Sequence, residues 1–292
     1  MEKLKKHLSL SEQVNLLKRR GLIIDDSNEA MQTLFSINYY RLSGYLHDFK
    51  QPQTDNYIVG FSWKRLKHIY DFDRKLTRIL LYALEDIEET LKARLSYTLT
   101  AQHPDDPLIY LRPRVYREYN PYIRFLQHFY EAKENNQNLP FIKHHNKKYG
   151  GFLPMWVAIE LFTMGNLQAV YNNLKPKYQK ELAKSYKTGP RQLANWIENL
   201  TYTRNHLAHY MRVYNFNFGR TPMDCKNHLR TFSTSGMIFD QIYIMYCMYS
   251  KIDEWNNYIL SDMLSLIEQY KDDIELPGLG FPNNWETILR LN

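Results

Sequence analysis

One long apolar repeat, over residues 61–102, constrains the fold of this chain more than any other feature. Its apolar residues recur at steps of three and four and are Leu66, Ile69, Leu76, Leu80, Ala83, Ile87, Leu91 and Leu95. Such spacing lines one face of an α-helix, and the charged residues of the segment, Asp73 among them, fall mainly between the apolar ones. A helix of this length is typical of a bundle, in which shorter helices pack along it.

The rest of the chain also shows helical spacing in its longer segments. Only 11 of the 292 residues are glycine, and 44% are apolar, which is enough for a substantial core. We therefore expect an all-α fold, a helical bundle with additional N-terminal and inserted helices. Further helices are expected from Ser9 or Ser11 to about residue 20, from Ser27 to about 37, at about 122–132, 154–164 and 167–174, from Pro190 into a polar motif near residue 204, and within 237–271.

The order of these segments predicts two regions. Residues 1–60 form an N-terminal helical region, and residues 61–292 form a larger helical domain with a basic insertion at about 104–151. Residues 103–107, His-Pro-Asp-Asp-Pro, end the long helix before this insertion, since proline interrupts helices. Gly165 and Asn166 are expected to break the apolar helix that starts at Pro154.

The net charge of +7 is unevenly distributed along the chain. Residues 111–230 contain 19 Lys and Arg against 7 Asp and Glu, a net charge of +12. Residues 240–292 contain 3 Lys and Arg against 9 Asp and Glu, a net charge of −6. The basic segment favours a polyanion such as RNA as a partner, and a basic protein without nucleic acid fits the charge equally well.

Tyrosine is abundant, with 24 residues, and in the basic segment it alternates with arginine. Tyrosine rings can stack on bases while arginines contact phosphates, although for any single tyrosine packing on the core is the simpler interpretation. His144 and His145 indicate a basic surface rather than a metal site, because no acidic or cysteine ligand lies nearby in the sequence. The candidate RNA-binding residues of this segment are Arg112, Arg114, Arg117, Lys143, Lys147 and Lys148.

Residues 204–209, Arg-Asn-His-Leu-Ala-His, combine the groups that metal-independent RNA cleavage requires. Arg204 can hold a phosphate through two N–H groups, and His209 can exchange a proton near neutral pH. Cleavage must deprotonate the ribose 2′-OH, stabilise the charge that develops on the phosphate and protonate the leaving oxygen. For six residues taken alone, ordinary polar helix residues are the simpler alternative.

Three further motifs accompany this one in order along the chain. They are INYYRLSGY at residues 37–45, LPMWVAIELFTMGNL at 153–167 and GFPNNWETIL at 280–289. Over about residues 10–289 the set resembles the Abi-2 family, the AbiD/AbiF-like abortive-infection proteins of bacteria. The arginine, the polar residue after it and the following histidine are similar to the signature of HEPN-type ribonucleases.

The resemblance implies a bundle of HEPN type and an antiphage, toxin-like endoribonuclease that is silent until infection. By resemblance the catalytic residues are Arg204, which holds the scissile phosphate, Asn205, which orients His209 or the phosphate by hydrogen bonds, and His209, which acts as base or acid. The product would carry a 2′,3′-cyclic phosphate, and neither a metal nor another cofactor is needed. The resemblance also implies a structured small noncoding RNA as a partner that restrains the nuclease.

The spacing on a regular helix argues against a site completed within one chain. At about 100° per residue, Asn205, His209 and Arg212 project from nearly the same face. Arg204 then lies about 140° from His209. Convergence requires either a bend at Arg204 or a second copy of the motif. In HEPN ribonucleases two motifs meet across a dimer interface, so we expect a homodimer, with Arg212 as a further phosphate contact.

Several residues near these motifs have both a functional and a structural interpretation. Arg41 is a candidate phosphate contact, whereas Tyr40 and Tyr45 are expected to pack among the N-terminal helices. His206 points away from His209 on a helix and is expected to support the motif or to face solvent.

Two carboxylates are expected to pair with arginines. Trp156 and Glu160 lie in an apolar segment that predicts a buried helix start, and a carboxylate there needs a partner such as an arginine of the motif helix. Glu88 of the long helix is a candidate partner of Arg204.

Two other functions stay open from the sequence. One is an RNA-binding protein that forms a ribonucleoprotein with a specific small RNA and does not cleave it. The other is a purely structural partner in a toxin–antitoxin pair, which would bind no RNA.

The remaining composition concerns the compartment. The two cysteines, Cys225 and Cys247, are too few for a disulfide framework or a zinc site. No apolar run reaches the length of a membrane span, and the N-terminal residues lack the apolar core of a signal peptide. We therefore expect a cytoplasmic protein that makes no membrane contact.

Overall fold

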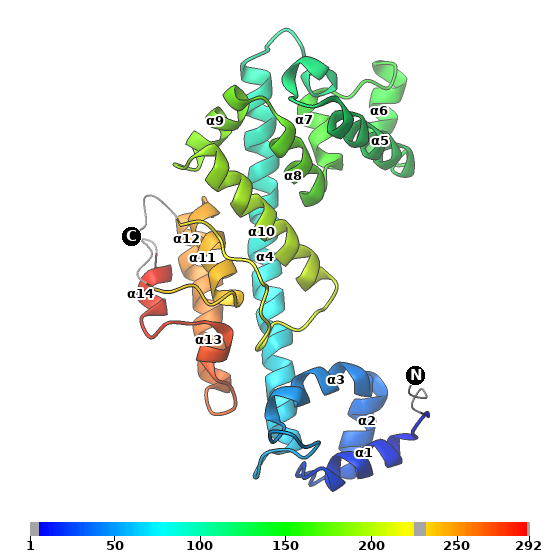
Figure 1. Ribbon diagram of the computed structural model, residues 1–292. Coiled ribbons are helices and arrows are strands. Elements are labelled where there is room, and N and C mark those ends of the chain that lie inside the picture. Colours follow the sequence, from blue (N-terminus) through cyan, green and yellow to red (C-terminus); the bar gives the residue numbers. More distant parts are fainter. Residues whose placement is uncertain (1–5, 225–231, 291–292) are drawn as a thin grey trace.

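The computed structural model describes residues 6–224 and 232–290, and the regular structure of these residues is helical, with isolated bridges but no β-strand (Figure 1). The predicted all-α helical bundle is confirmed. Within the described ranges, no helix is both long enough and apolar enough to cross a membrane. Cys225 lies outside the described residues, and Cys247 lies half-buried on α11 (Ile238–Met248).

The predicted long helix is α4 (Trp63–Ala101), which has 39 residues and runs through the whole molecule (Figure 1). The hydroxyl of Ser62 caps its first turn by accepting a hydrogen bond from the amide of Arg65 at 3.1 Å. All eight residues of the apolar repeat are buried. They contact helices on several sides, because α3, α7, α8, α9, α10, α11 and α13 all pack on α4.

The N-terminal helices lie at one end of α4 (Figure 1). They are α1 (Leu10–Arg19), α2 (Ser27–Ser36) and α3 (Tyr39–Leu46). Ser9 and Glu12 form the capping box of α1, which confirms the first of the two predicted caps. The division at residue 60 stays a prediction, and α3 contacts α4 directly across it.

The cap of α2 differs from the prediction by one residue. Asp26 rather than Ser27 is the N-cap, because its carboxylate accepts hydrogen bonds from the amides of Asn28 and Glu29 at 2.8 and 3.1 Å. A charged acceptor makes the stronger hydrogen bond to these amides.

At the other end of α4, three helices pack on it: α7 (Met155–Ala158), α8 (Met164–Asn173) and α9 (Pro176–Ser185). Farther from α4, α5 (Tyr119–Asn135) packs on α8, and α6 (Pro140–Lys148) lies near α5 (Figure 1). The helix expected at 122–132 is longer than predicted. The sequence reading missed α6 and α9, both of which begin at a proline in the first helical turn.

The apolar helix expected at 154–164 begins after Pro154, as predicted, but it ends at Leu161 rather than near residue 164. After α7 the chain forms a 3-10 turn at Ile159–Leu161 and becomes extended at Phe162. Thr163 then starts α8, because its hydroxyl accepts from the amide of Asn166 at 3.2 Å while the Asn166 side chain accepts from the amide of Thr163 at 3.0 Å. Gly165 and Asn166 therefore begin a helix rather than break one.

The C-terminal half completes the bundle around α4. The predicted helix from Pro190 is α10 (Pro190–Ala208), which packs on α4, α8, α9 and α11. After α11 the chain continues through α12 (Ile252–Glu254), a π-helical turn (Trp255–Leu260) and α13 (Ser261–Tyr270), and α13 lies along α4. A short α14 (Trp285–Leu289) follows. Buried residues from all these parts form one apolar cluster.

Candidate functional site

The predicted catalytic residues lie in the last turn of α10. Arg204 is half-buried, Asn205 is exposed, and His209 is the exposed C-cap residue of the helix. Arg204 and His209 do not contact each other, in agreement with the angular separation expected from the sequence. The His209 side chain has no hydrogen-bond partner among the described residues.

The helix does not continue to Arg212, so the common face expected for Asn205, His209 and Arg212 is wrong. Tyr210 has a left-handed φ of 59°, its amide donates to the carbonyl of Leu207, and the amide of Met211 donates to the carbonyl of His206. These two bonds form a Schellman motif, whose left-handed position is usually glycine. Because tyrosine stands there instead of glycine, no sequence signal marks the end of this helix.

Arg212 instead lies against α3 and the 3-10 turn after it. Its Nη1 donates to the carbonyl of Gly44 and to the carboxylate of Asp48, both at 2.6 Å. Arg212, expected to contact phosphate, thus has two hydrogen-bond partners within the chain. It connects the chain after α10 to α3 and stabilises the fold.

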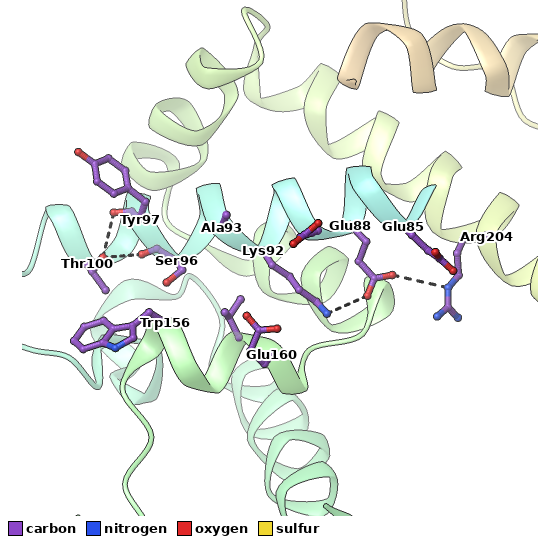
Figure 2. A pocket seen from close by; sticks show the side chains of 12 residues that line it. Glu85, Glu88, Lys92, Ala93, Ser96, Tyr97, Thr100, Trp156, Glu160 and Arg204 are labelled. Atoms are coloured by element: carbon purple, nitrogen blue, oxygen red, sulfur yellow. Dashed lines mark hydrogen bonds and ion pairs between the residues drawn. The ribbon is translucent and has the colours of Figure 1, made fainter. Parts of the chain in front are cut away.

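Arg204 faces α4, where its Nε lies 3.9 Å from Oε2 of Glu88 (Figure 2). The predicted pairing of Glu88 with Arg204 is confirmed. The other carboxylate oxygen of Glu88 forms an ion pair with Lys92, whose Nζ lies 3.3 Å away. Nη1 of Arg204 also donates to the side-chain oxygen of Asn205 at 3.4 Å. The long, partly exposed ion pair orients Arg204 and contributes little to stability.

A cleft of about 730 Å³ opens beside Arg204 between α4, the segment after Pro154 and α10 (Figure 2). Trp156 and Glu160 line it and are both exposed, so the burial expected for Trp156 is wrong, whereas Met155 and Ala158 of the same helix start are buried as predicted. Glu160 forms no ion pair within the part of the chain that the structure describes. This segment presents Glu160 to the cleft rather than to the core.

The charge of the cleft is mainly negative. Its carboxylates are Glu85, Glu88, Glu89 and Glu160, and its cations are Lys92 and Arg204. A phosphate group is repelled by most of this lining and attracted only near the two cations, Lys92 and Arg204.

His206 is buried, with 8% of its surface exposed, so the solvent-facing alternative is wrong and the supporting one is confirmed. Its Nε2 donates to the carbonyl of Arg212 at 2.7 Å, and its ring packs against Phe216 with centroids 4.3 Å apart. Burial lowers the pKa of His206 below its usual value. His209 is therefore the one histidine of the motif that is free to act on a ligand.

Asp73 is a buried anchor that the sequence reading missed. Only 1% of it is exposed, and it accepts the Tyr45 hydroxyl at 2.5 Å and the amides of Val213 and Tyr214 at 3.0 and 2.7 Å. Burial raises the pKa of Asp73 to about 6, while these hydrogen bonds act in the opposite direction. A signal was present, since Asp73 is four residues after Ile69 and thus lies on the apolar face of α4.

The N-terminal motif lies beside the end of α10. Nη1 of Arg41 donates to the carbonyl of Tyr210 at 2.6 Å. Tyr45 is buried, as predicted, whereas Tyr40 is 85% exposed and does not pack as expected. Tyr40 is the second residue of α3 and points to solvent from its first turn.

The other candidate RNA-binding residues lie near the opposite end of α4, and the structure does not bring them to the motif (Figure 1). Arg112 and Arg114 share the carboxylate of Asp106 at 3.0 and 2.9 Å. Nη2 of Arg117 donates to the carbonyl of Asn172 at 2.6 Å.

The lysines of α6 are the candidate RNA-binding residues whose side chains form neither an ion pair nor a hydrogen bond among the described residues, although the ammonium of Lys148 lies 5.2 Å from the ring centroid of Tyr149. Lys143, Lys147 and Lys148 are exposed. At about 100° per residue, these lysines and the exposed His144 are spread over an arc of about 140° around the helix, with Lys143 and Lys147 closest together. Across the described ranges, no cluster of three or more His, Cys, Asp or Glu side chains is arranged to hold a metal ion.

Comparison with known proteins gives one match. A family model described as Abi-like protein matches residues 32–215, more than half of the chain, from α2 to the turn after α10. No curated protein and no solved structure matches the chain.

Proposed function

Because the chain belongs to the Abi-like protein family, whose name marks abortive infection, we propose that it is an antiphage, metal-independent endoribonuclease of HEPN type that acts in the cytoplasm. The observation that carries this proposal is the solvent-accessible set of Arg204, Asn205 and His209 at the end of α10. Glu88 orients the arginine, and the side chain of His209 has no hydrogen-bond partner among the residues that the structure describes.

The proposed chemistry assigns one task to each side chain. His209 removes the proton of the ribose 2′-OH or protonates the 5′-oxygen that leaves. Arg204 holds the scissile phosphate and stabilises the charge that develops on it. Asn205, which already accepts from Arg204, keeps the guanidinium directed at the phosphate. The 2′-oxygen attacks phosphorus, so the product carries a 2′,3′-cyclic phosphate.

A homodimer supplies what one chain lacks. The reaction needs a base and an acid, yet each motif offers a single available histidine because His206 is buried in the fold. Two copies of His209 meet this need if two α10 ends face each other. Sedimentation of the purified protein tests the dimer, and a monomer at working concentration contradicts it.

The test of cleavage is the digestion of RNA by purified protein in EDTA. Arg204→Ala and His209→Ala should each lower the rate by at least about a hundredfold. Arg78→Ala is the matched control, because Arg78 is an exposed arginine of α4 outside the motif. If both motif variants cut as fast as wild type, the assigned site is wrong.

A second candidate function is a ribonucleoprotein in which a structured noncoding RNA is bound and holds the nuclease in check, as in a toxin–antitoxin pair. The exposed lysines of α6, remote from the motif, favour this candidate. A discrete RNA that copurifies with His209→Ala protein at high salt supports it. A preparation free of nucleic acid at moderate salt contradicts it.

A further inference from the structure

The turn that follows His209 at the end of α10 is held in place by residues of α3 and α4. Arg41 donates to the carbonyl of Tyr210, the residue next to His209, at 2.6 Å. Two residues further, Arg212 donates to the carbonyl of Gly44 at 2.6 Å. Asp73 then accepts the amides of Val213 and Tyr214. The conformation of the whole turn thus depends on residues far away in the sequence.

Local sequence does not favour this turn. Tyr210 is a non-glycine residue at a φ of 59°, a left-handed conformation that is unfavourable for most side chains. Such a backbone persists only when its surroundings hold it. Besides Arg41 at its carbonyl, Tyr210 has the guanidinium of Arg74 over its ring, 4.7 Å from the centroid.

We propose that Arg41, with Tyr45 and Asp73 behind it, is a positioning residue for His209 rather than a phosphate contact. The His209 side chain has no partner among the described residues, so its direction depends on its backbone alone. That backbone is fixed on one side by α10 and on the other by the turn that Arg41 holds. The inference rests on the proposed function only for the statement that His209 reacts with RNA.

The connection between the two sides is continuous. Arg41, Gly44 and Tyr45 belong to one helix, α3, and Tyr45 donates through its hydroxyl to the same Asp73 that accepts the amides of the turn. The exposed arginine of α3 and its buried tyrosine therefore act on one turn from two sides.

The first experiment examines His209 without RNA. Three variants are compared: Arg41→Met, which removes the donor, Arg41→Lys, which keeps one, and the control Arg78→Met. The ring signals of ¹⁵N-histidine are assigned with His209→Ala, and chymotrypsin cleavage after Tyr210 reports opening of the turn. We expect Arg41→Met to shift the His209 signal and to raise the cleavage rate about fivefold, with Arg41→Lys close to wild type. Since Arg41 is exposed, these variants leave the core intact.

The opposing result is equally specific. An unchanged His209 signal and unchanged proteolysis in Arg41→Met overturn the positioning role. If RNA affinity at low salt falls at the same time, Arg41 is a phosphate contact, as the sequence first indicated.

A second experiment separates this inference from the proposed function. In single-turnover RNA cleavage we expect Arg41→Met to lower the rate about tenfold with little change in RNA affinity. If His209→Ala cleaves as well as wild type, the proposed function fails, while the shift of the His209 signal still stands as evidence for the turn. If His209 is essential and Arg41→Met cleaves at the wild-type rate, the positioning role fails and the proposed function stands.

Discussion

The two histidines of the motif, His206 and His209, lie only three residues apart, yet the first is buried and the second is exposed. His206 is inside the helix and faces the core, where its ring packs with Phe216 and its Nε2 bonds to a carbonyl. His209 caps the helix and is exposed. A buried neutral ring stabilises the fold and resists protonation, whereas an exposed ring can exchange protons with a substrate.

The contribution of His206 to stability should therefore fall as the pH falls below about 6.5, the usual pKa of histidine in an unfolded chain. The pKa of His206 is lowered on folding, so below that pH the unfolded state binds a proton that the folded state refuses. The contribution is at most about 1.4 kcal/mol per pH unit. Between pH 7 and 5.5 the free energy of unfolding of wild type, measured in urea, should fall relative to that of His206→Gln. Parallel pH dependences of the two proteins contradict the assignment.

Protonation of Asp73 has the opposite effect on stability. The quantity to measure is therefore the difference in the free energy of unfolding between wild type and His206→Gln. The pKa of Asp73 is raised on folding from 3.8 to about 6, so its protonation stabilises the fold as the pH falls through that range. This contribution is the same in wild type and in His206→Gln and cancels.

Removing the Asp73 carboxylate should destabilise the protein by about 3 kcal/mol or more, because one hydroxyl and two amides lose their buried acceptor. Urea unfolding of Asp73→Ala measures the loss. Asp71→Ala is the control: Asp71 lies on the same helix and makes only a partly exposed ion pair with Lys67, so it should change stability by less than about 0.5 kcal/mol. Equal effects of the two variants contradict the anchoring role.

At the scale of elements, helix ends were set by capping geometry. Thr163 and Asn166 begin α8 with a capping box, and Tyr210 ends α10 in a conformation that usually requires glycine. The middle of each helix follows apolar spacing instead. The long helix α4 is the clearest case, because its buried face contacts helices from both halves of the chain.

Truncation on that face should be severe. Leu95 is fully buried between helices that pack on α4, so Leu95→Ala should cost roughly 2–5 kcal/mol through lost apolar burial and the cavity left behind. Tyr97, two residues further and 75% exposed, supplies the control, and Tyr97→Ala should lie within about 0.5 kcal/mol of wild type. Thermal unfolding measures both, and a Leu95→Ala protein as stable as the Tyr97→Ala protein contradicts the packing.

At the scale of the whole molecule, the basic candidates and the motif occupy different parts of the bundle. The lysines of α6 lie beside one end of α4, and the turn after α10 lies beside α3 (Figure 1). An RNA that binds at both places must therefore extend along the molecule. A short substrate would reach only the motif.

This arrangement predicts that binding and cleavage are separable. In a His209→Ala background, Lys147→Ala with Lys148→Ala should weaken binding of a labelled RNA hairpin and lower the slope of log affinity against log salt by about 1.5. In the cleaving protein the same pair should leave the rate on a dinucleotide unchanged. The control pair is Lys64→Ala with Arg78→Ala, both exposed on α4. An equal loss of affinity in both pairs would mean that charge alone, and not the lysines of α6 in particular, binds the RNA.

Much of the fold could be predicted from the sequence because it depends on interactions between residues close together in the chain. The repeat from Leu66 to Leu95, the cap at Ser9 and the helix start at Pro190 depend on residues within a few positions of one another. The pairing of Glu88 with Arg204 was also anticipated as a candidate. The extended backbone at Phe162 was missed because apolar spacing continues through that residue.

The sequence by itself determined the long helix, the all-α class and the residues of the motif, because periodic spacing and residue chemistry are properties of neighbours along the chain. Only the tertiary structure decided where α10 ends, which groups donate to the carboxylate of Asp73, and that Arg41 and Arg212 hold the turn next to His209. Those outcomes depend on hydrogen bonds between α3, α4 and the turn after α10. No local pattern records such bonds, since their partners lie more than a hundred residues apart.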